Sequence, residues 1–457
     1  MFHSNIKEQY YVAQQTLAPL RLSKREMFLL MRLPGEVKVV TNARLAAPDS
    51  PYIIKNNQFP VAVFPSYMYE EIKKLPDHTA SLPAYLSRKP FAPYTLIGRE
   101  TTALLNSIEL DLARALPVTA PKRQQDAQIA VRDRIGDFPN WEEVKIFPAV
   151  LDMVATTNAA FFMGDDPAMA KRWSEPSIEY VTRTWIGALV IGYLPRVLQS
   201  MLAPFAFLPT IVTKWKKIKE FQESTAKKSL LTVSKDGKLP LTAALMSQYK
   251  PHEATLGRVV KDYIALAFLT KFAVAVALHL SIIDFASRPE LVKVIREEVR
   301  VTTSDGLLPQ SHLSELCKLD SVMRESLQVN AMSLFVLNRL LRQPTQLSIG
   351  PKLPAGMAIS VDMYHINRSS ALWKSPERFE PMRYHDLQQI PDGENKFQFV
   401  SIGPESPLWG IGSTVCPGWL FANSTIKVTL VSLLTQFDIR FAPGHMKEAK
   451  AAVPEGS

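Results

Sequence analysis

The pattern of apolar and polar positions predicts a chain that is mostly helical. Helical patterns dominate from about residue 98 to residue 335, and the sequence contains no internal repeat and no low-complexity linker. Residues 36–46 and 51–64 contain β-branched or aromatic runs bounded by Pro and Gly, which predict strands. Residues 67–75 then predict a short helix. We expect one large, mainly α domain with a smaller β-rich N-terminal part.

The longest helical candidate covers residues 262–285. It is apolar on every face, so it either lies in a core or spans a membrane. Lys271 and His279 fall inside it, and a charge in the middle of a bilayer costs about 2.5–3.5 kcal/mol on insertion scales. The sequence therefore predicts one long core helix, followed from Pro289 by a charged amphipathic helix.

Residues 185–213 are strongly apolar but are broken by prolines, and a basic stretch follows at residues 214–219. Apolar residues beside Trp and Lys suit an interfacial contact with a membrane. Core helices followed by a solvated basic face explain the same pattern equally well. Residues 1–30 read as a polar, partly helical lead-in with no visible membrane anchor, so any membrane contact would come from elsewhere in the chain.

Composition narrows the class of protein. With 47% apolar and 21% charged residues, the chain can bury a sizeable core. The net charge of +10 suits acidic protein partners or anionic lipid, whereas nucleic acid is not expected because no basic-aromatic tract or zinc-finger spacing is present. The two cysteines, Cys317 and Cys416, exclude a disulfide scaffold and indicate a reducing compartment.

Cys416 lies in a glycine-framed loop, residues 409–418, directly before a helical pattern. Glycines let the backbone approach a flat macrocycle closely, and N–H groups near a helix start stabilise charge on sulfur. Pro417 suits an early helical position. These features are typical of a thiolate that ligates heme iron. The alternative is an inert, buried thiol that acts as a small apolar side chain.

Five separated segments carry a resemblance to one family: Asp284–Glu290, Leu319–Gln328, Leu353–Gly356, Phe379–Tyr384 and Trp409–Ala422. In this order and spacing the sequence resembles the cytochromes P450, and within them the fungal secondary-metabolism branch. The resemblance covers about residues 30–440. It implies the cytochrome P450 fold as a single large heme domain over residues 31–445, between the lead-in and a C-terminal tail at residues 446–457.

The resemblance also implies roles for single residues around a heme. Cys416 would be the axial iron ligand, within a loop that contains Trp409, Gly410, Gly412, Thr414 and Gly418. Glu325 and Arg383 match the family's charge-assisted pair near this loop, but Gln328 stands where the family has Arg. A neutral amide lacks the bidentate fork and the charge, so we expect folding with weaker heme retention.

Thr414 likewise stands where the family usually has a cation that contacts a heme propionate. A propionate must then find another partner. Arg339 is a candidate, because family members often place such an arginine soon after the Glu-x-x-Arg helix. The alternative for Arg339 is an ordinary solvated arginine.

The central helix departs most from the family. Its oxygen-activating position, where the family has an acid or amide followed by Thr, falls at residues 272–274. Ala273 and Val274 cannot deliver protons to iron-bound dioxygen, and Thr270 lies one turn away from the matching position. Phe268, Phe272 and Val276 are candidates for an apolar substrate pocket, although ordinary core packing also explains each of them.

Two functions remain open at this point. The first is a heme-thiolate monooxygenase of fungal secondary metabolism that acts on an apolar small molecule, such as a terpenoid or polyketide, with electrons from NADPH through a reductase. The second is a heme protein that rearranges, isomerises or cyclises its substrate without activating dioxygen. The resemblance places the protein at the cytoplasmic surface of the endoplasmic reticulum, or in the cytoplasm if it has no anchor.

Overall fold

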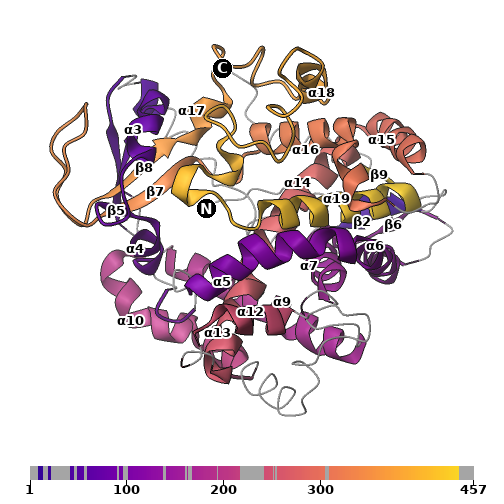
Figure 1. Cartoon of the computed structure of the whole chain (residues 1–457), viewed down its shortest axis with the longest axis horizontal. Coiled ribbons are helices and arrows are strands. Elements are labelled where there is room, and N and C mark those ends of the chain that lie inside the picture. Colours follow the sequence, from indigo (N-terminus) through magenta and orange to yellow (C-terminus); the bar gives the residue numbers. More distant parts are fainter. Residues whose placement is uncertain are drawn as a thin grey trace.

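The computed structural model describes residues 9–13, 19–21, 42–45, 49–55, 59–89, 92–95, 101–136, 140–159, 162, 167–192, 194–216, 241–250, 252, 255–303 and 308–441. Helices fill most of the molecule, and two small sheets lie on opposite sides of it (Figure 1). The predicted fold class, mainly α with a smaller β part, is confirmed.

The five-stranded sheet joins distant parts of the chain. Its strand order is β3 (Tyr52–Lys55), β4 (Pro60–Phe64), β8 (Ala358–Asp362), β7 (Phe335–Leu341) and β5 (Ala80–Ser81), and only the β4–β8 pair among these is parallel. The strands expected within residues 51–64 are confirmed. The β structure is not confined to the N-terminal part, however, because two of the five strands follow residue 330.

The second sheet corrects the expectation for residues 1–30. Strand β1 (Gln9–Ala13) pairs with β2 (Pro19–Arg21), with β6 (Glu142–Glu143) and with β9 (Asp438–Phe441). The described part of the lead-in is therefore extended, not helical. Its partner β9 lies more than 400 residues away along the chain, and hydrophobic periodicity carries no information about such pairing.

Residues 42–45 are helical, so the strand expected over residues 36–46 is wrong for those four positions. Residues 37–40, the β-branched part of the strand expected over residues 36–46, lie outside the described residues, and so does the tail from residue 446. The short helix expected at residues 67–75 is confirmed as η1 (Ser66–Met68) followed by α3 (Tyr69–Lys73).

The remaining helices supply most of the core. They are α4 (Leu82–Ser87), α5 (Thr102–Asn106), the π-helical η2 (Ser107–Leu112), α6 (Ala113–Ile135), α7 (Ile146–Thr157), α9 (Pro167–Gly192), α10 (Arg196–Ala206), α12 (Leu241–Gln248), α13 (Leu256–Leu269), α14 (Phe272–Ser287), α15 (Pro289–Thr302), η3 (Gln310–Ser314), α16 (Cys317–Val329), α17 (Met363–Asn367), α18 (Arg383–Gln388), η4 (Pro407–Trp409), η5 (Gly412–Thr414) and α19 (Trp419–Gln436). The largest apolar cluster joins α6, α7, α14, α15, α16 and α19.

The segment expected to be one helix over residues 262–285 is two helices, α13 and α14. The backbone N–H and the hydroxyl of Thr270 both donate to the Leu266 carbonyl, which ends α13. Lys271 is 1% exposed, and its ammonium donates to Ser177 Oγ of α9 at 2.5 Å. A buried ammonium needs polar partners, and apolar periodicity does not report that need. The predicted core position of α14 is confirmed.

Helix α10 and the helical residues after it form an exposed apolar surface. Val197–Lys216 is, among the described residues, the one helix long and apolar enough to cross a membrane by length and composition, and 28% of its apolar stretch is buried. Its exposed side chains include Val197, Met201, Phe205 and Trp215. The explanation as core helices holds for part of the region, because Ile191, Ala203 and Phe207 form a buried cluster. The exposed face of α10 lies at the edge of the molecule (Figure 1), and contact with a membrane stays a prediction.

A buried ion pair fixes the segment between α16 and α18. Arg383 Nε and Nη2 donate to the Glu325 carboxylate at 2.9 and 3.2 Å, and the Glu380 N–H donates to it at 2.8 Å. The Arg383 guanidinium also donates to the carbonyls of Lys374, Ser375 and Arg378. The pair thus carries the bidentate geometry that the family's network uses, without any contribution from residue 328.

We expect Glu325→Gln to lower the free energy of unfolding by about 3–5 kcal/mol, because it leaves the Arg383 cation buried without a carboxylate. Denaturant unfolding followed by circular dichroism measures this loss. Glu297→Gln is the matched control, since it removes a carboxylate from an exposed pair with Arg300. Equal unfolding midpoints for the two variants would contradict the structural role of the buried pair.

Candidate active site

The loop before α19 is held by its own backbone. The Cys416 N–H donates to the Trp409 carbonyl at 2.7 Å, and the Thr414 N–H donates to the Ile411 carbonyl at 3.1 Å. Gly410 has a φ of +75°, and a Cβ there would lie 2.3 Å from the Thr414 carbonyl oxygen. No other residue type fits this position, because the turn needs both the left-handed backbone and the absent side chain.

Cys416 is a free thiol at the start of α19. Cys416 is exposed, although surrounding protein atoms partly desolvate its sulfur. Burial raises the pKa of the Cys416 thiol, and a hydrogen bond from the Gly418 backbone acts in the opposite direction. Within the described residues no group of three or more His, Cys, Asp or Glu side chains is placed to hold a metal ion.

The central helices differ in exposure around the break between them. Leu269 and Ala273 are exposed and Val276 is half-buried, while Val274 is 4% exposed and belongs to the main core. Of the two candidate oxygen-activating positions, the structure therefore exposes Ala273 and buries Val274. Thr270 is half-buried, and its hydroxyl is already used by the Leu266 carbonyl.

The aromatic pocket candidates gather on one tryptophan. Phe272 stacks on Trp185 of α9 at 4.1 Å between ring centroids, and Phe268 stacks on it at 6.0 Å. Phe272 and Val276 also pack against the main core, as ordinary core packing predicts, and their role in a substrate pocket stays a prediction. Trp185 was missed as a site residue. Its signal was present in the apolar segment 185–213, but only the fold shows that α9 covers the central helices.

Gln328 takes no part in the carboxylate pair. It is buried, its Oε1 accepts from the Tyr384 hydroxyl, and its Nε2 donates to the Asn367 carbonyl at 2.9 Å. Gln328 therefore belongs to a neutral network, separate from the Glu325–Arg383 pair. Arg324, one position before Glu325, donates to the Lys396 and Gln398 carbonyls and thereby holds the segment that leads to the cysteine loop.

Arg339 is 1% exposed and donates to the Leu75 carbonyl at 2.5 Å. The solvated alternative for this arginine is therefore wrong. Thr414 donates its hydroxyl to the Ile411 carbonyl within the loop. A cation missed by sequence reasoning is Lys73, whose side chain lies 3.1 Å from the Cβ position of Gly412 and pairs with Glu70 at 3.3 Å. No sequence motif marks Lys73, because α3 is distant from the loop along the chain.

These residues fit a heme. The exposed thiol of Cys416 suits an axial ligand, and Gly410 and Gly412 keep the loop free of side chains next to it. Gly418 packs closely as well, since a Cβ there would lie 3.4 Å from Ile108 Cγ2. Lys73 lies beside Gly412 and supplies a positive charge at the edge of the loop. An acidic group of a macrocycle bound there needs such a charge to neutralise it.

Comparison with known proteins supports the same assignment. Residues 190–454 match the family model described as Cytochrome P450. A curated relative, "Cytochrome P450 monooxygenase ccsD" of Aspergillus clavatus, is 38% identical over 92% of this chain and 87% of its own length. "Pyrichalasin C-18 hydroxylase" of Pyricularia grisea is 30% identical over 96% of this chain and 86% of its own length.

Solved structures agree on the fold. "Retinoic acid bound cyanobacterial CYP120A1" superposes with a TM-score of 0.67 at 18% identity and covers 88% of each chain. The "cytochrome P450DA heme domain" superposes with a TM-score of 0.65 at 12% identity, over 89% of this chain and 88% of that one.

The relatives carry monooxygenase or hydroxylase names, and none of these names supports the alternative of a rearranging heme protein. Heme with cysteine-thiolate ligation is the cofactor of this family. The chain belongs to the cytochrome P450 family, in its fungal secondary-metabolism branch, and is an enzyme of the heme-thiolate monooxygenase type.

Proposed function

We propose that this enzyme hydroxylates an apolar small molecule, such as a terpenoid or polyketide, with Cys416 as the axial ligand of its heme. The observation that carries this assignment is the exposed thiol of Cys416 in a loop that only glycine allows at Gly410. When bound, a thiolate-ligated heme reduces dioxygen with two electrons and two protons, places one oxygen atom in a C–H bond and releases the other as water.

The chain's own residues orient this cofactor. Trp409 packs its ring against Phe399 and donates its indole N–H to the Phe399 carbonyl at 2.7 Å, so its ring is fixed beside the cysteine loop. Gly410, Gly412 and Gly418 leave room for the macrocycle. Lys73 and Arg339 are the cations we assign to its propionates, and Thr414 serves the loop backbone instead.

An apolar substrate fits the aromatic group on α9, α13 and α14. Trp185, Phe268 and Phe272 form a stacked set, and Val276 lies on the same helix one turn further along. Such a surface excludes water and offers no hydrogen-bond donor from Phe or Val, so it binds through apolar area. The relative named as a C-18 hydroxylase supports hydroxylation as the reaction type.

The protons do not come from a hydroxyl on the central helix. Ala273 is the open position, Val274 is buried, and Thr270 is committed to a backbone carbonyl. Water held near Ala273, or a hydroxyl of the substrate, is the source that remains next to the described part of this helix.

Electrons come from NADPH through a reductase, and we place the enzyme at the cytoplasmic face of the endoplasmic reticulum. The exposed apolar residues Met201, Phe205 and Trp215 support a peripheral contact with lipid. Lys214 and Lys216 lie beside them, and basic residues strengthen binding to anionic headgroups. The net charge of +10 also favours an acidic redox partner.

Absorption spectra test the ligand assignment. The reduced protein under carbon monoxide should show the red-shifted Soret band of a thiolate complex, and Cys416→Ser should lose it completely. Cys317→Ser is the control, because this half-buried thiol lies outside the loop and should leave the band unchanged. A thiolate band that survives Cys416→Ser would overturn the assignment.

Ala273→Ser should raise the amount of product formed per NADPH oxidised by about two-fold or more, because it places a hydroxyl at the exposed position 273. An apolar compound that shifts the ferric spectrum serves as test substrate, with reductase and NADPH supplied. Val274→Thr is the matched control, because its hydroxyl would point into the core and bond back to a helix carbonyl. If both variants gain equally, or neither does, residue 273 does not limit proton delivery.

Phe205→Glu combined with Met201→Glu should reduce binding to phosphatidylcholine–phosphatidylserine vesicles at least about ten-fold, because two apolar side chains can no longer enter the interface. Co-sedimentation measures the bound fraction. Val118→Glu with Ile129→Glu adds the same charge to exposed apolar positions of α6 and should bind as the unmodified protein does. Equal losses in both double variants would point to charge alone.

A further inference from the structure

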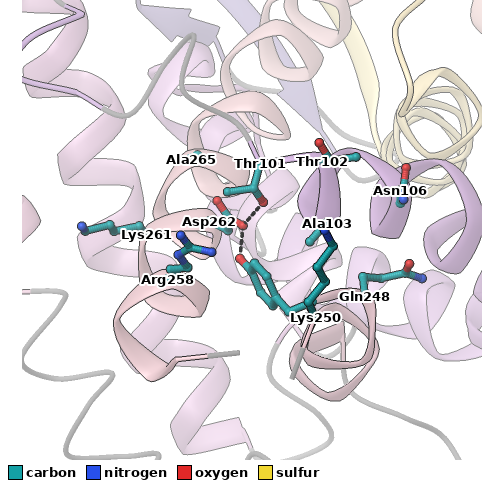
Figure 2. Close-up of a pocket in the computed structure, with 11 residues that line it drawn as sticks. Thr101, Thr102, Ala103, Asn106, Gln248, Lys250, Arg258, Lys261, Asp262 and Ala265 are labelled. Atoms are coloured by element: carbon teal, nitrogen blue, oxygen red, sulfur yellow. Dashed lines mark hydrogen bonds between the residues drawn. The ribbon is translucent and has the colours of Figure 1, made fainter. Parts of the chain in front are cut away.

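A cavity lies where α5, α12 and α13 meet, apart from the cysteine loop. It has a volume of about 800 Å³ and is lined by residues of α5, α12 and α13 and the turn after α12. Figure 2 shows that most side chains around it are polar or charged. Cavities of this size hold small organic molecules, but those are usually lined mainly by apolar groups. This cavity therefore suits a polar ligand, unlike the aromatic set at Trp185.

The floor of the cavity is a buried carboxylate. Asp262 is 3% exposed and accepts hydrogen bonds from the hydroxyls of Thr101 and Tyr249, drawn as dashed lines in Figure 2. Burial raises the pKa of the Asp262 carboxyl, and these two hydroxyls act against the shift. The hydroxyls of Thr101 and Tyr249 are both occupied by Asp262, so these three side chains hold one another in place and do not bind the ligand.

The recognition elements are cations. Lys250, Arg258 and Lys261 line the cavity and are exposed to it, and with Asp262 ionised the four charged groups carry a net charge of +2. Arg258 and Lys261 come from α13, whereas Lys250 follows α12, so the cations come from two elements. In Figure 2 the Arg258 guanidinium lies near Asp262, and the Lys261 side chain extends away from it. The side-chain amide of Asn106 adds a further donor at the edge.

We propose that this cavity binds a small organic anion through its carboxylate or phosphoryl oxygens, with Lys250, Arg258 and Lys261 as the contacts. Arg offers a bidentate fork to an oxyanion, and Lys acts as a mobile point charge, so the set accommodates a ligand with more than one acidic group. The size of the cavity leaves room for the body of the molecule beyond its acidic groups.

This site is separate from the oxidation site. None of its lining residues belongs to the cysteine loop or to the group Leu269, Ala273 and Val276. Ala265 is the lining residue of α13 furthest along the helix, and Leu269 lies one helical turn further on. A ligand here would contact the half of the central helix that precedes the break at Thr270, and its binding does not depend on turnover.

Isothermal titration calorimetry of the heme-loaded protein tests the proposal, with citrate, inorganic phosphate and neutral myo-inositol at an ionic strength held constant with NaCl. We expect citrate or phosphate to bind and myo-inositol not to bind. Tighter citrate binding identifies a carboxylate ligand, and tighter phosphate binding identifies a phosphoryl ligand. The ferric Soret band should stay unchanged, which separates this site from the iron. Absence of binding by both anions would overturn the proposal.

Variants locate the binding. Lys250→Gln with Lys261→Gln should weaken anion binding by about ten-fold, and the corresponding Lys→Arg pair should restore it. Asp262→Asn should instead tighten anion binding, because it removes the one acidic side chain that lines the cavity. The amide oxygen of the new residue can still accept the hydrogen bond from Thr101. Lys293→Gln on α15 is the control for an exposed lysine elsewhere. Unchanged affinity in the double glutamine variant would show that the anion binds at another place, and would refute the site.

Discussion

The buried pair between Glu325 and Arg383 is the interaction on which the position of the iron ligand depends. It fixes the loop that ends at α18, and its neighbour Arg324 holds the carbonyls of residues 396 and 398. Asp320, one turn earlier on α16, accepts from the Phe399 N–H at 2.6 Å and pairs with Lys427 of α19 at 2.5 Å. Charged groups of one helix thereby hold both ends of the segment that carries Cys416.

This arrangement explains why Gln328 is tolerated. In the family a second cation would sit at this position, yet here Arg383 alone engages both oxygens of Glu325, and the amide of Gln328 is satisfied by Tyr384 and Asn367. No buried polar atom of the Gln328 side chain is left without a partner, so the substitution exchanges a charged contact for a neutral one. Weaker heme retention stays a prediction, because it depends on the strength of this network when the cofactor is bound.

Local chemistry was predictable from the sequence, and long-range pairing was not. The glycine-framed loop at Cys416, the strand at β4 and the start of α15 at Pro289 follow from residues close together in the chain. The pairing of β1 with β9, the burial of Arg339 and the contact of Lys73 with the loop depend on elements far apart in sequence. The break after α13 was missed for a different reason: the apolar pattern continues through it, and only the hydrogen bonds of Thr270 and Lys271 interrupt the helix.

That break divides the central segment into two chemical environments. Before it, α13 presents Arg258, Lys261 and Asp262 to a polar cavity; after it, α14 presents Ala273 and Val276 beside an aromatic set. Lys271 lies between them, and its ammonium donates a hydrogen bond to Ser177 of α9, the helix that also carries Trp185. The Lys271 ammonium is thereby bound to α9 and is not presented at Ala273. This contact anchors α9, the helix that covers the aromatic set, to the break between α13 and α14.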